Sequence, residues 1–203
     1  MSILLIRHGQ TRENKNHIVQ PADVSLSELG LQQAGLLAER LRSLGIEQIL
    51  CSDLPRATET ANQIAMQTQC AVTLTALLRE RNFGTLRGRA YADIELDIFA
   101  ENYSPPEGET WQEFDLRVAQ AWQSIVDLTA RTNGRVAVVT HGLVCRSIVN
   151  NFLDNERQET IPDRWDNTSV TEFDKTAPHK IRLLNDTGHL SKANVNCEFS
   201  APV

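Results

Sequence analysis

Near the start of the chain lies Ile3-Leu4-Leu5-Ile6-Arg7-His8-Gly9, an apolar run that stops at a charged residue, a histidine and a glycine. An unbroken apolar run of this length is typical of a strand that is buried on both faces of a sheet. Residues 46–50 and 136–140 show the same pattern and predict two further buried strands. Weaker strand patterns lie at residues 71–77, 170–174 and 181–184.

Stretches with helical periodicity separate these runs, at residues 27–43, 55–65, 111–128 and 144–152. Ser27 is suited to cap the first of these helices, and Gly45 is suited to end it. Strands that alternate with helices predict a mainly parallel sheet that is covered on both faces. We therefore expect residues 1–203 to form a single domain of the α/β class, with three α/β/α layers.

The composition predicts a soluble globular protein with a real core, because 41% of the 203 residues are apolar and 23% are charged. The longest apolar runs are too short to cross a membrane. The N-terminus lacks the basic start and the cleavage site of a signal peptide. The four cysteines form no CxxC pair and no metal-ligand spacing. We therefore expect reduced thiols in a cytoplasmic protein, with no membrane partner.

The formal net charge of −6 argues against a nucleic-acid-binding protein, because phosphate backbones select basic surfaces. The charge is uneven along the chain. Residues 1–90 carry ten Lys and Arg against eight Asp and Glu, whereas residues 91–203 carry ten against eighteen. The first part would suit a small anionic substrate. The acidic residues between 93 and 115 are most simply interpreted as a solvated segment.

Cationic and histidine side chains follow three of the predicted parallel strands. Arg7 and His8 end the first strand, Arg56 follows the second, and His141 follows the strand at 136–140. The carboxyl ends of parallel strands lie at one edge of a sheet, where ligands bind. Guanidinium groups suit phosphoryl oxygens, and a neutral imidazole held through one nitrogen can attack phosphorus through the other. Each residue alone is more often a surface or packing residue, but together they predict a phosphoryl site.

Four motifs, in order along the chain, resemble those of the histidine phosphatase superfamily, which has the phosphoglycerate mutase-like fold. They are Arg7-His8-Gly9-Gln10-Thr11 with Asn14, and residues 52–61, 78–88 and 139–142. Residues 167–170 and 185–190 are similar to the closing segments of the family. The resemblance covers nearly the whole chain and implies a phosphatase-branch enzyme.

The resemblance also implies a role for each site residue. His8 would be the nucleophile that becomes phosphohistidine. Glu80 would be the general acid that protonates the leaving oxygen and later activates water, which requires a carboxyl pKa raised by partial burial. The phosphoryl group would be bound by four other side chains, Arg7, Asn14, Arg56 and His141. The expected enzyme is a metal-independent, histidine acid-type phosphatase that needs no cofactor and hydrolyses a small phosphate monoester.

Two alternatives stay open, a phosphoglycerate mutase and, less favoured, a catalytically weak phosphate-binding or scaffold protein. Family mutases carry extra basic residues after the Glu80 motif, whereas residues 91–115 contain no Lys or Arg. Gln20-Pro21 replaces the usual glycine of the family, which leaves the substrate contacts of this loop open. Glu109 is a candidate for contact with the non-phosphate part of the substrate.

Two segments depart from the alternation of strands and helices. We expect residues 91–132 to form a helical excursion over the active site. We expect residues 186–203, which are polar and weakly patterned, to form a loosely ordered tail. The sequence contains no indication of the oligomeric state.

Overall fold

The computed structural model describes residues 1–156, 160–193 and 195. Its centre is a six-stranded sheet in the order β3-β2-β4-β1-β5-β6. The strands are β1 (Ser2–Arg7), β2 (Ile46–Ser52), β3 (Val72–Thr75), β4 (Arg135–Thr140), β5 (Val170–Asp174) and β6 (Ile181–Asp186). β1 to β4 are parallel, and β5 runs antiparallel to both of its neighbours. The predicted mainly parallel sheet is therefore confirmed.

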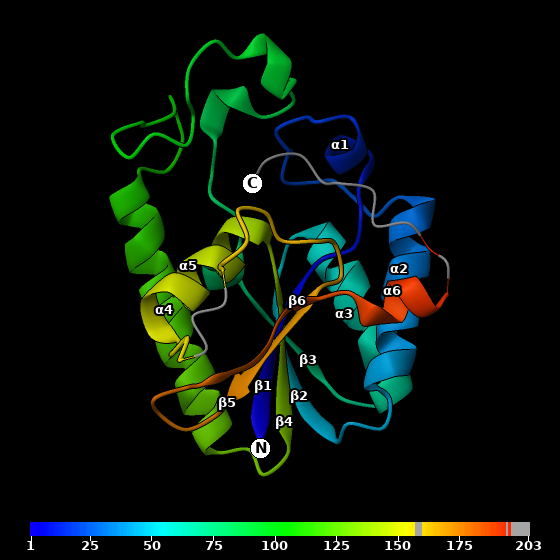
Figure 1. Cartoon of the computed structure of the whole chain (residues 1–203). Helices are drawn as coiled ribbons and strands as arrows, with labels where there is room; N and C mark the ends of the chain where they lie inside the picture. The colour runs from blue at the N-terminus through cyan, green and yellow to red at the C-terminus, as the bar shows by residue number, and fades with distance from the viewer. Residues whose placement is uncertain (157–159, 194, 196–203) are drawn as a thin grey trace.

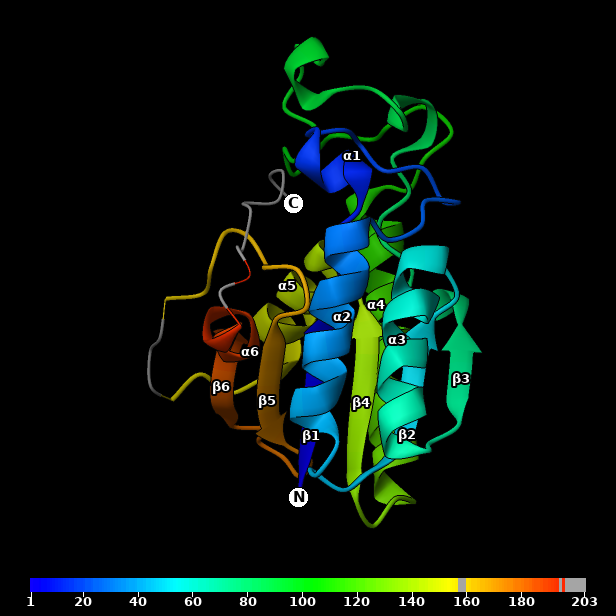
Figure 2. The same cartoon turned by 90° about the vertical axis from the view of Figure 1, so that its right-hand side faces the viewer.

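Helices cover both faces of this sheet, as Figures 1 and 2 show. The helices are α4 (Trp111–Ala130) and α5 (Gly142–Phe152) on one face, and α2 (Glu28–Leu41), α3 (Pro55–Thr68) and α6 (Gly188–Lys192) on the other. Side chains of β1 alternate between two cores. Ile3 and Leu5 pack with α4 and α5, whereas Leu4 and Ile6 pack with α2 and α3. The three-layer α/β/α architecture is confirmed.

Local capping explains where the helices begin. The Ser27 hydroxyl accepts a hydrogen bond from the Gly30 N–H at 3.0 Å, as expected for the start of α2. A capping box between Thr110 and Glu113 starts α4. A second capping box, between Thr11 and Asn14, starts the short helix α1 (Arg12–Lys15). This helix was not predicted from the sequence.

The segment before α4 differs from the predicted helical excursion. Between residues 76 and 110 the chain forms only short 3₁₀ turns, which are η1 (Ala76–Leu78), η2 (Gly84–Leu86) and η3 (Tyr91–Asp93). α4 itself is a layer helix, because its apolar side chains Phe114, Val118 and Ile125 are fully buried in the core. Of the predicted excursion, only the segment before α4 lies above the carboxyl ends of the strands. This segment is green in Figures 1 and 2 and lies next to α1.

Arg81 holds this irregular segment in place. Its side chain is buried, and its guanidinium carbon lies 3.8 Å from the centroid of the Trp111 ring, a cation–π contact. The guanidinium also donates to three carbonyl oxygens of the segment, those of Ile98, Tyr103 and Glu109. Gly84 has a φ of +53°, and a Cβ there would lie 1.9 Å from the Pro106 carbonyl oxygen. The segment is therefore ordered by tertiary contacts rather than by helical periodicity.

The start of the predicted loose tail is also structured. β6 extends to Asp186, where the carboxylate pairs with Arg40 at 2.5 Å. α6 follows at once and buries Leu190 completely. One apolar side chain and one ion pair therefore order the chain as far as α6. The rest of the expected tail, residues 194 and 196–203, lies outside the described residues, and so does Cys197.

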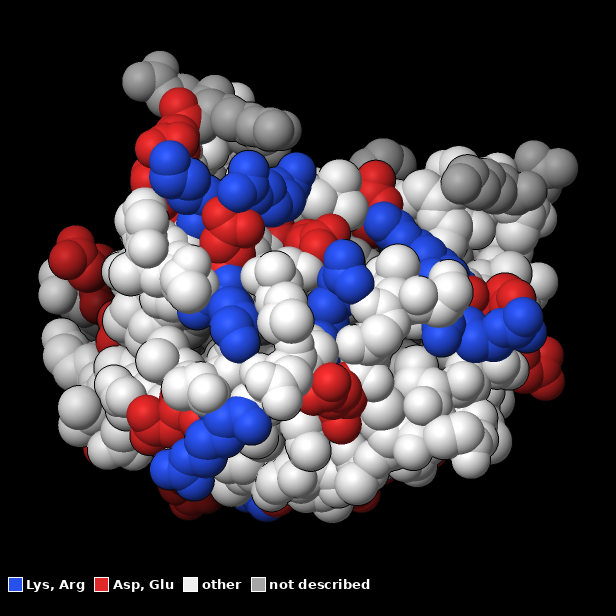
Figure 3. All heavy atoms as spheres, turned by 90° about the horizontal axis from the view of Figure 1, so that it is seen from below, with Lys and Arg blue, Asp and Glu red and all other residues white. Residues whose placement is uncertain are grey.

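The surface of the described residues agrees with an ordinary globular domain. Figure 3 views the face at the end of the sheet where the N-terminus lies, and there Lys and Arg side chains are interspersed with Asp and Glu. None of the described helices has the length and apolar character that a membrane span needs. The three cysteines that the structure describes, Cys51, Cys70 and Cys145, are free thiols.

Candidate active site

The parallel strands bring the predicted site residues to one edge of the sheet. Arg7 at the end of β1 pairs in register with Thr140 at the end of β4. β2 pairs with the other side of β4, which places Ser52 beside His141. The predicted convergence of three strand ends therefore follows directly from strand order and register.

His8 is fully buried and held in one orientation. Its Nδ1 lies 2.7 Å from the carbonyl oxygen of Gly9, so this nitrogen carries the proton and donates it. The other ring nitrogen, Nε2, then has its lone pair free. Burial, together with the charges of Arg56 and Arg7, holds the pKa of His8 well below its usual range. His8 is therefore a neutral imidazole at neutral pH, as a nucleophile must be.

His141 lies against His8, with 5.0 Å between the two ring centroids. Its Nε2 lies 2.8 Å from the Ser52 hydroxyl, whereas its Nδ1 is buried without a hydrogen-bond partner. Burial, and then Arg56, hold the pKa of His141 well below its usual range. An unpaired polar atom at this depth is costly and indicates a place where a ligand atom would bind.

Arg7 and Arg56 supply the positive charge of the site. Arg7 donates through Nη1 to the Trp165 carbonyl oxygen, and Arg56 donates through Nη1 to the Pro21 carbonyl oxygen at 3.1 Å. The Nε of each arginine is buried and has no partner. Burial lowers the pKa of Arg56 to about 10, so it remains charged at neutral pH. Two buried guanidinium groups with unpaired N–H donors are suited to an anion.

Glu80 lies near both arginines and is held through its two carboxyl oxygens. Oε1 accepts the Arg81 backbone N–H at 3.0 Å, and Oε2 accepts the Leu143 N–H at 3.1 Å. Burial raises the pKa of Glu80, and this effect exceeds the opposing effects of the two N–H donors and of Arg56 and Arg7. A raised carboxyl pKa is what a general acid needs at neutral pH.

Asn14 connects the first motif to the closing segments of the chain. Its Oδ1 accepts the Thr11 backbone N–H and an Asn167 N–H, each at 3.3 Å. Asn167 also donates to the His8 carbonyl oxygen at 3.0 Å. Asn14 and Asn167 therefore hold the backbone at the predicted nucleophile and in the turn that follows it.

A narrow pocket, which we call the phosphoryl pocket, opens above these groups. The residues that line it are Arg7, Asn14, Ile18, Gln20, Arg56, Glu80, Arg81, Phe83, Arg87 and Tyr91. Four of the six predicted site residues are in this lining. The other two, His8 and His141, are fully buried.

Four polar residues of this lining were not predicted as site residues from the sequence, and they are Gln20, Arg81, Arg87 and Tyr91. Gln20 was noted only as a departure from the family pattern, yet its amide oxygen accepts the Thr11 hydroxyl at 2.9 Å. Arg81 and Arg87 lie within the third motif, which was a signal that could have found them. Tyr91 belongs to the irregular segment and had no sequence signal.

Glu109 was predicted to contact the non-phosphate part of a substrate. In the structure, its two carboxyl oxygens accept hydrogen bonds from Arg117 at 2.8 and 2.7 Å. The backbone N–H of Asn82 donates to the same carboxylate at 3.2 Å. The Glu109 carboxylate is therefore already paired and is a poor candidate for direct contact with a substrate.

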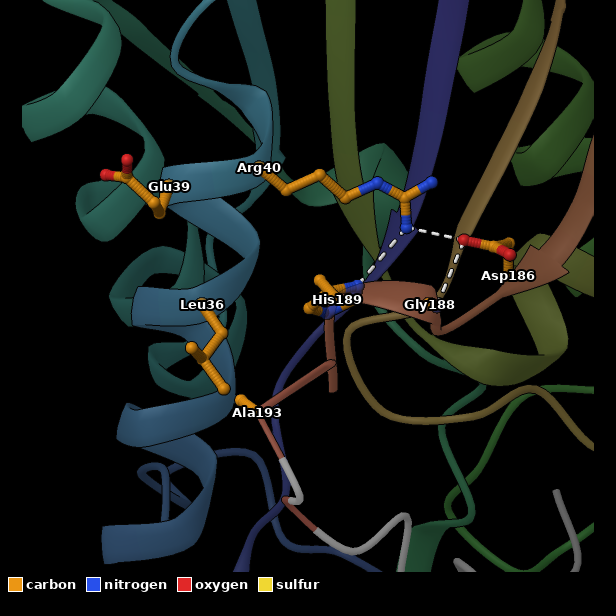
Figure 4. Close-up of a pocket in the computed structure, with 7 residues that line it drawn as sticks. All are labelled: Leu36, Glu39, Arg40, Asp186, Gly188, His189 and Ala193. Atoms are coloured by element: carbon orange, nitrogen blue, oxygen red, sulfur yellow. Dashed lines mark hydrogen bonds and ion pairs between the residues drawn. The ribbon is translucent and has the colours of Figure 1, made fainter. Parts of the chain in front are cut away.

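A separate cavity lies between α2 and α6 (Figure 4), where Arg40 lies between His189 and Asp186. Arg40 contacts the His189 Nδ1 at 3.2 Å, and the Nε2 of His189 lies 3.0 Å from the Thr168 hydroxyl. Thr168 has a φ of +56°, and its N–H donates to the Arg7 carbonyl oxygen at 3.1 Å. This cavity therefore borders residues that support the strand end carrying Arg7.

Comparison with known proteins gives a consistent result along the chain. The family model described as histidine phosphatase superfamily (branch 1) matches residues 3–187. A probable phosphatase of Schizosaccharomyces pombe is 32% identical over 200 residues, which cover 94% of this chain and 95% of that protein. A probable phosphoglycerate mutase, GpmB, of Erwinia tasmaniensis is 32% identical over 184 residues, which cover 86% and 85%.

Solved structures agree with the sequence relatives. YhfR of Bacillus stearothermophilus superimposes with a TM-score of 0.80 at 27% identity, over 93% of this chain and 98% of that one. The alpha-ribazole phosphatase of Shigella flexneri gives a TM-score of 0.76 at 26% identity, over 92% and 97%. The match over nearly the whole length, with the four motifs assembled at one edge of the sheet, shows that this chain belongs to the histidine phosphatase superfamily.

Proposed function

We propose that the protein is a phosphatase that hydrolyses a small phosphate monoester through a phosphohistidine on His8. The observation that carries this proposal is the state of His8, a buried neutral imidazole whose Nδ1 is held by the Gly9 carbonyl oxygen. The His8 ring lies beside that of His141 and is close enough to Arg56 and Arg7 to feel their charge, which supports a site for a phosphoryl group in transfer.

In the first step, Nε2 of His8 attacks phosphorus, and the bond between phosphorus and the ester oxygen breaks. Glu80 gives its proton to the departing oxygen, so that an alcohol leaves instead of an alkoxide. Arg7 and Arg56 neutralise the oxygens of the phosphoryl group. His141, whose Nδ1 has no partner, would add a hydrogen bond to the same oxygens.

In the second step, water attacks the phosphohistidine. Glu80, now a carboxylate, accepts a proton from the water as the new bond to phosphorus forms. The bond between phosphorus and Nε2 breaks, and inorganic phosphate leaves with His8 restored. His8 and Glu80 each do the reverse of what they did in the first step. Arg7 and Arg56 supply the positive charge in both steps, without a metal ion or a cofactor.

The named relatives support both a phosphatase and a mutase, because both names occur among them at 32% identity. The absence of Lys and Arg from residues 91–115 favours hydrolysis, since a mutase must hold a doubly charged phosphoglycerate in two orientations. A scaffold role is less favoured because His8, Glu80 and both arginines are all present. We also propose a cytoplasmic location, with no nucleic-acid or membrane partner.

The test is phosphate release from a panel of phosphate monoesters by the wild type and by the His8→Ala variant. We expect His8→Ala to lose activity by about a thousand-fold or more and to remain folded, which thermal unfolding would check. The exposed His17 offers a matched control, and His17→Ala should keep its activity. Acid-labile, base-stable phosphate should appear on the wild-type protein during turnover and be absent from His8→Ala.

Three results would contradict the proposal. Activity of His8→Ala within a few fold of the wild type would remove His8 from the chemistry. Interconversion of phosphoglycerates faster than phosphate release would make the protein a mutase. Tight binding of phosphate without turnover of any ester in the panel would support the scaffold alternative.

A further inference from the structure

A second cavity adjoins the phosphoryl pocket. It has a volume of about 470 Å³, and its charged lining residues are Arg79, Glu80, Arg87, Glu109, Glu113 and Arg117. Glu80 and Arg87 line both cavities. Under the proposed function, Glu80 protonates the leaving oxygen, so the rest of the leaving group extends past Glu80. We call this second space the leaving-group cavity, and its volume suits a small molecule.

Two of the three arginines in the leaving-group cavity are already neutralised. Arg79 donates two hydrogen bonds to the Asp53 carboxylate, at 2.6 and 2.5 Å. Arg117 forms a similar two-point pair with Glu109, at 2.8 and 2.7 Å. Both guanidinium groups therefore have their anion within the chain and contribute little net charge to a ligand.

Arg87 differs from these two arginines. Its side chain is partly buried and makes no hydrogen bond or ion pair within the part of the chain that the structure describes. The other acid of the cavity, Glu113, is engaged in the capping box of Thr110 at the start of α4. Burial and the nearby charge of Arg79 lower the pKa of Arg87. Arg87 is therefore a cation that lacks a counter-ion inside a cavity.

We propose that Arg87 binds a second anionic group on the leaving part of the substrate, either a carboxylate or a phosphate. This inference rests on the proposed function and names a substrate class, a small alkyl phosphate that carries a further negative charge. The planar guanidinium offers two parallel donors, which match a carboxylate or a phosphate. Glu80 lines the same cavity, which places the ester oxygen between the transferring phosphoryl group and the group that Arg87 holds.

Substrates of matched length test this inference. Propyl phosphate has an uncharged leaving group, 3-phosphonooxypropanoate adds a carboxylate, and propane-1,3-diyl bisphosphate adds a phosphate. Hydrogen bonds to charged groups contribute about 1.5–3 kcal/mol, which corresponds to a preference of about 10- to 100-fold. We expect the wild type to favour at least one of the anionic substrates over propyl phosphate by this factor in kcat/KM.

The variants locate the preference at Arg87. Arg87→Gln should lower kcat/KM for the favoured anionic substrate at least about ten-fold more than for propyl phosphate. Arg87→Lys keeps the charge without the fork and should restore part of the preference. Arg89 is an exposed matched control two residues away, and Arg89→Gln should leave the ratio between the substrates unchanged. Whichever anionic substrate is favoured identifies the second group as carboxylate or phosphate.

A binding measurement keeps this test separate from the proposed function. In the His8→Ala background, titration calorimetry with the same three compounds should show the same preference and its loss in Arg87→Gln, whether or not the wild type turns them over. Equal losses on charged and uncharged substrates would mean that Arg87 contacts the transferring phosphoryl group. A wild-type protein without preference, or a preference that survives in Arg87→Gln, would overturn the inference.

Discussion

Replacement of Glu80 by Gln should separate the two chemical steps. Gln cannot give up a proton, so the attack of His8 on an alkyl phosphate should slow by about 10²–10⁴-fold, the usual range for acid–base catalysis. A nitrophenolate leaves without protonation, so the same step with an aryl phosphate should slow much less. Phosphohistidine should accumulate with the aryl substrate, because the variant activates water poorly in the second step.

Replacement of Glu80 by Gln should also lower the free energy of unfolding, because the Glu80 carboxylate accepts two backbone hydrogen bonds. Its two oxygens accept the N–H groups of Arg81 and Leu143 at 3.0 and 3.1 Å. Gln offers one carbonyl oxygen, so one of these two donors loses its acceptor and faces an NH₂ group. An unsatisfied buried donor costs about 1–3 kcal/mol, within the 5–15 kcal/mol that typically stabilises a domain. Glu80→Gln should therefore unfold at a lower temperature and still be folded at 25 °C.

Rapid quench with both substrates, scored as acid-labile and base-stable phosphate on the protein, measures the phosphorylation step directly. Thermal unfolding of the same samples controls for the lost hydrogen bond. Equal rate losses on both substrates without a trapped phosphoenzyme would show that Glu80 only positions the backbone of Arg81 and Leu143. Another group would then have to carry the proton, and the pairing of Glu109 with Arg117 makes Glu109 a poor candidate.

Two further predictions concern metals and acid stability. EDTA should leave phosphate release unchanged, since no group of three or more His, Cys, Asp or Glu in the described ranges could hold a metal; loss of activity that Mg²⁺ or Zn²⁺ restores would contradict this. His189 has its pKa lowered to about 4 by burial and Arg40, from about 6.5 in the unfolded chain, so the unfolded state binds more protons between these values. The free energy of unfolding should therefore fall as the pH falls from 6.5 to 4, by about 1–3 kcal/mol after allowance for partial exposure. Urea unfolding at pH 7 and 4.5 should show a smaller loss of this free energy in His189→Gln than in the wild type. An identical loss in the two proteins would be evidence against the lowered pKa of His189.

The central layer could be predicted from sequence because its signals are local and redundant. Each inner strand is an apolar run, and the residues that follow β1, β2 and β4 must meet once those strands are parallel neighbours. The antiparallel direction of β5 could not be predicted, because a buried strand has the same pattern in either direction. The edge of the sheet at which the candidate site residues lie could be predicted for the same reason, because it follows from the order and the direction of the strands.

The irregular segment could not be predicted, because tertiary contacts hold it. Arg81 stacks on Trp111, thirty positions away in the chain, and no periodicity encodes such a contact. The ion pairs of the leaving-group cavity have the same character. Asp53 and Arg79 come from separate motifs, and Glu109 and Arg117 flank the start of α4. Only these pairings single out Arg87, so the sequence alone could not distinguish it from its neighbouring arginines.

The electrostatics of the site suggest how one carboxyl group can serve both steps. Arg7 and Arg56 oppose the effect of burial on Glu80 and hold its pKa below the value that burial alone would give. A dianionic phosphoryl group bound to the two arginines would offset their charge, and the pKa of Glu80 would then rise further. Substrate binding would therefore favour the protonated acid at the moment when the leaving oxygen needs a proton. Once that proton has departed with the alcohol, Glu80 is left as the carboxylate that the attacking water requires.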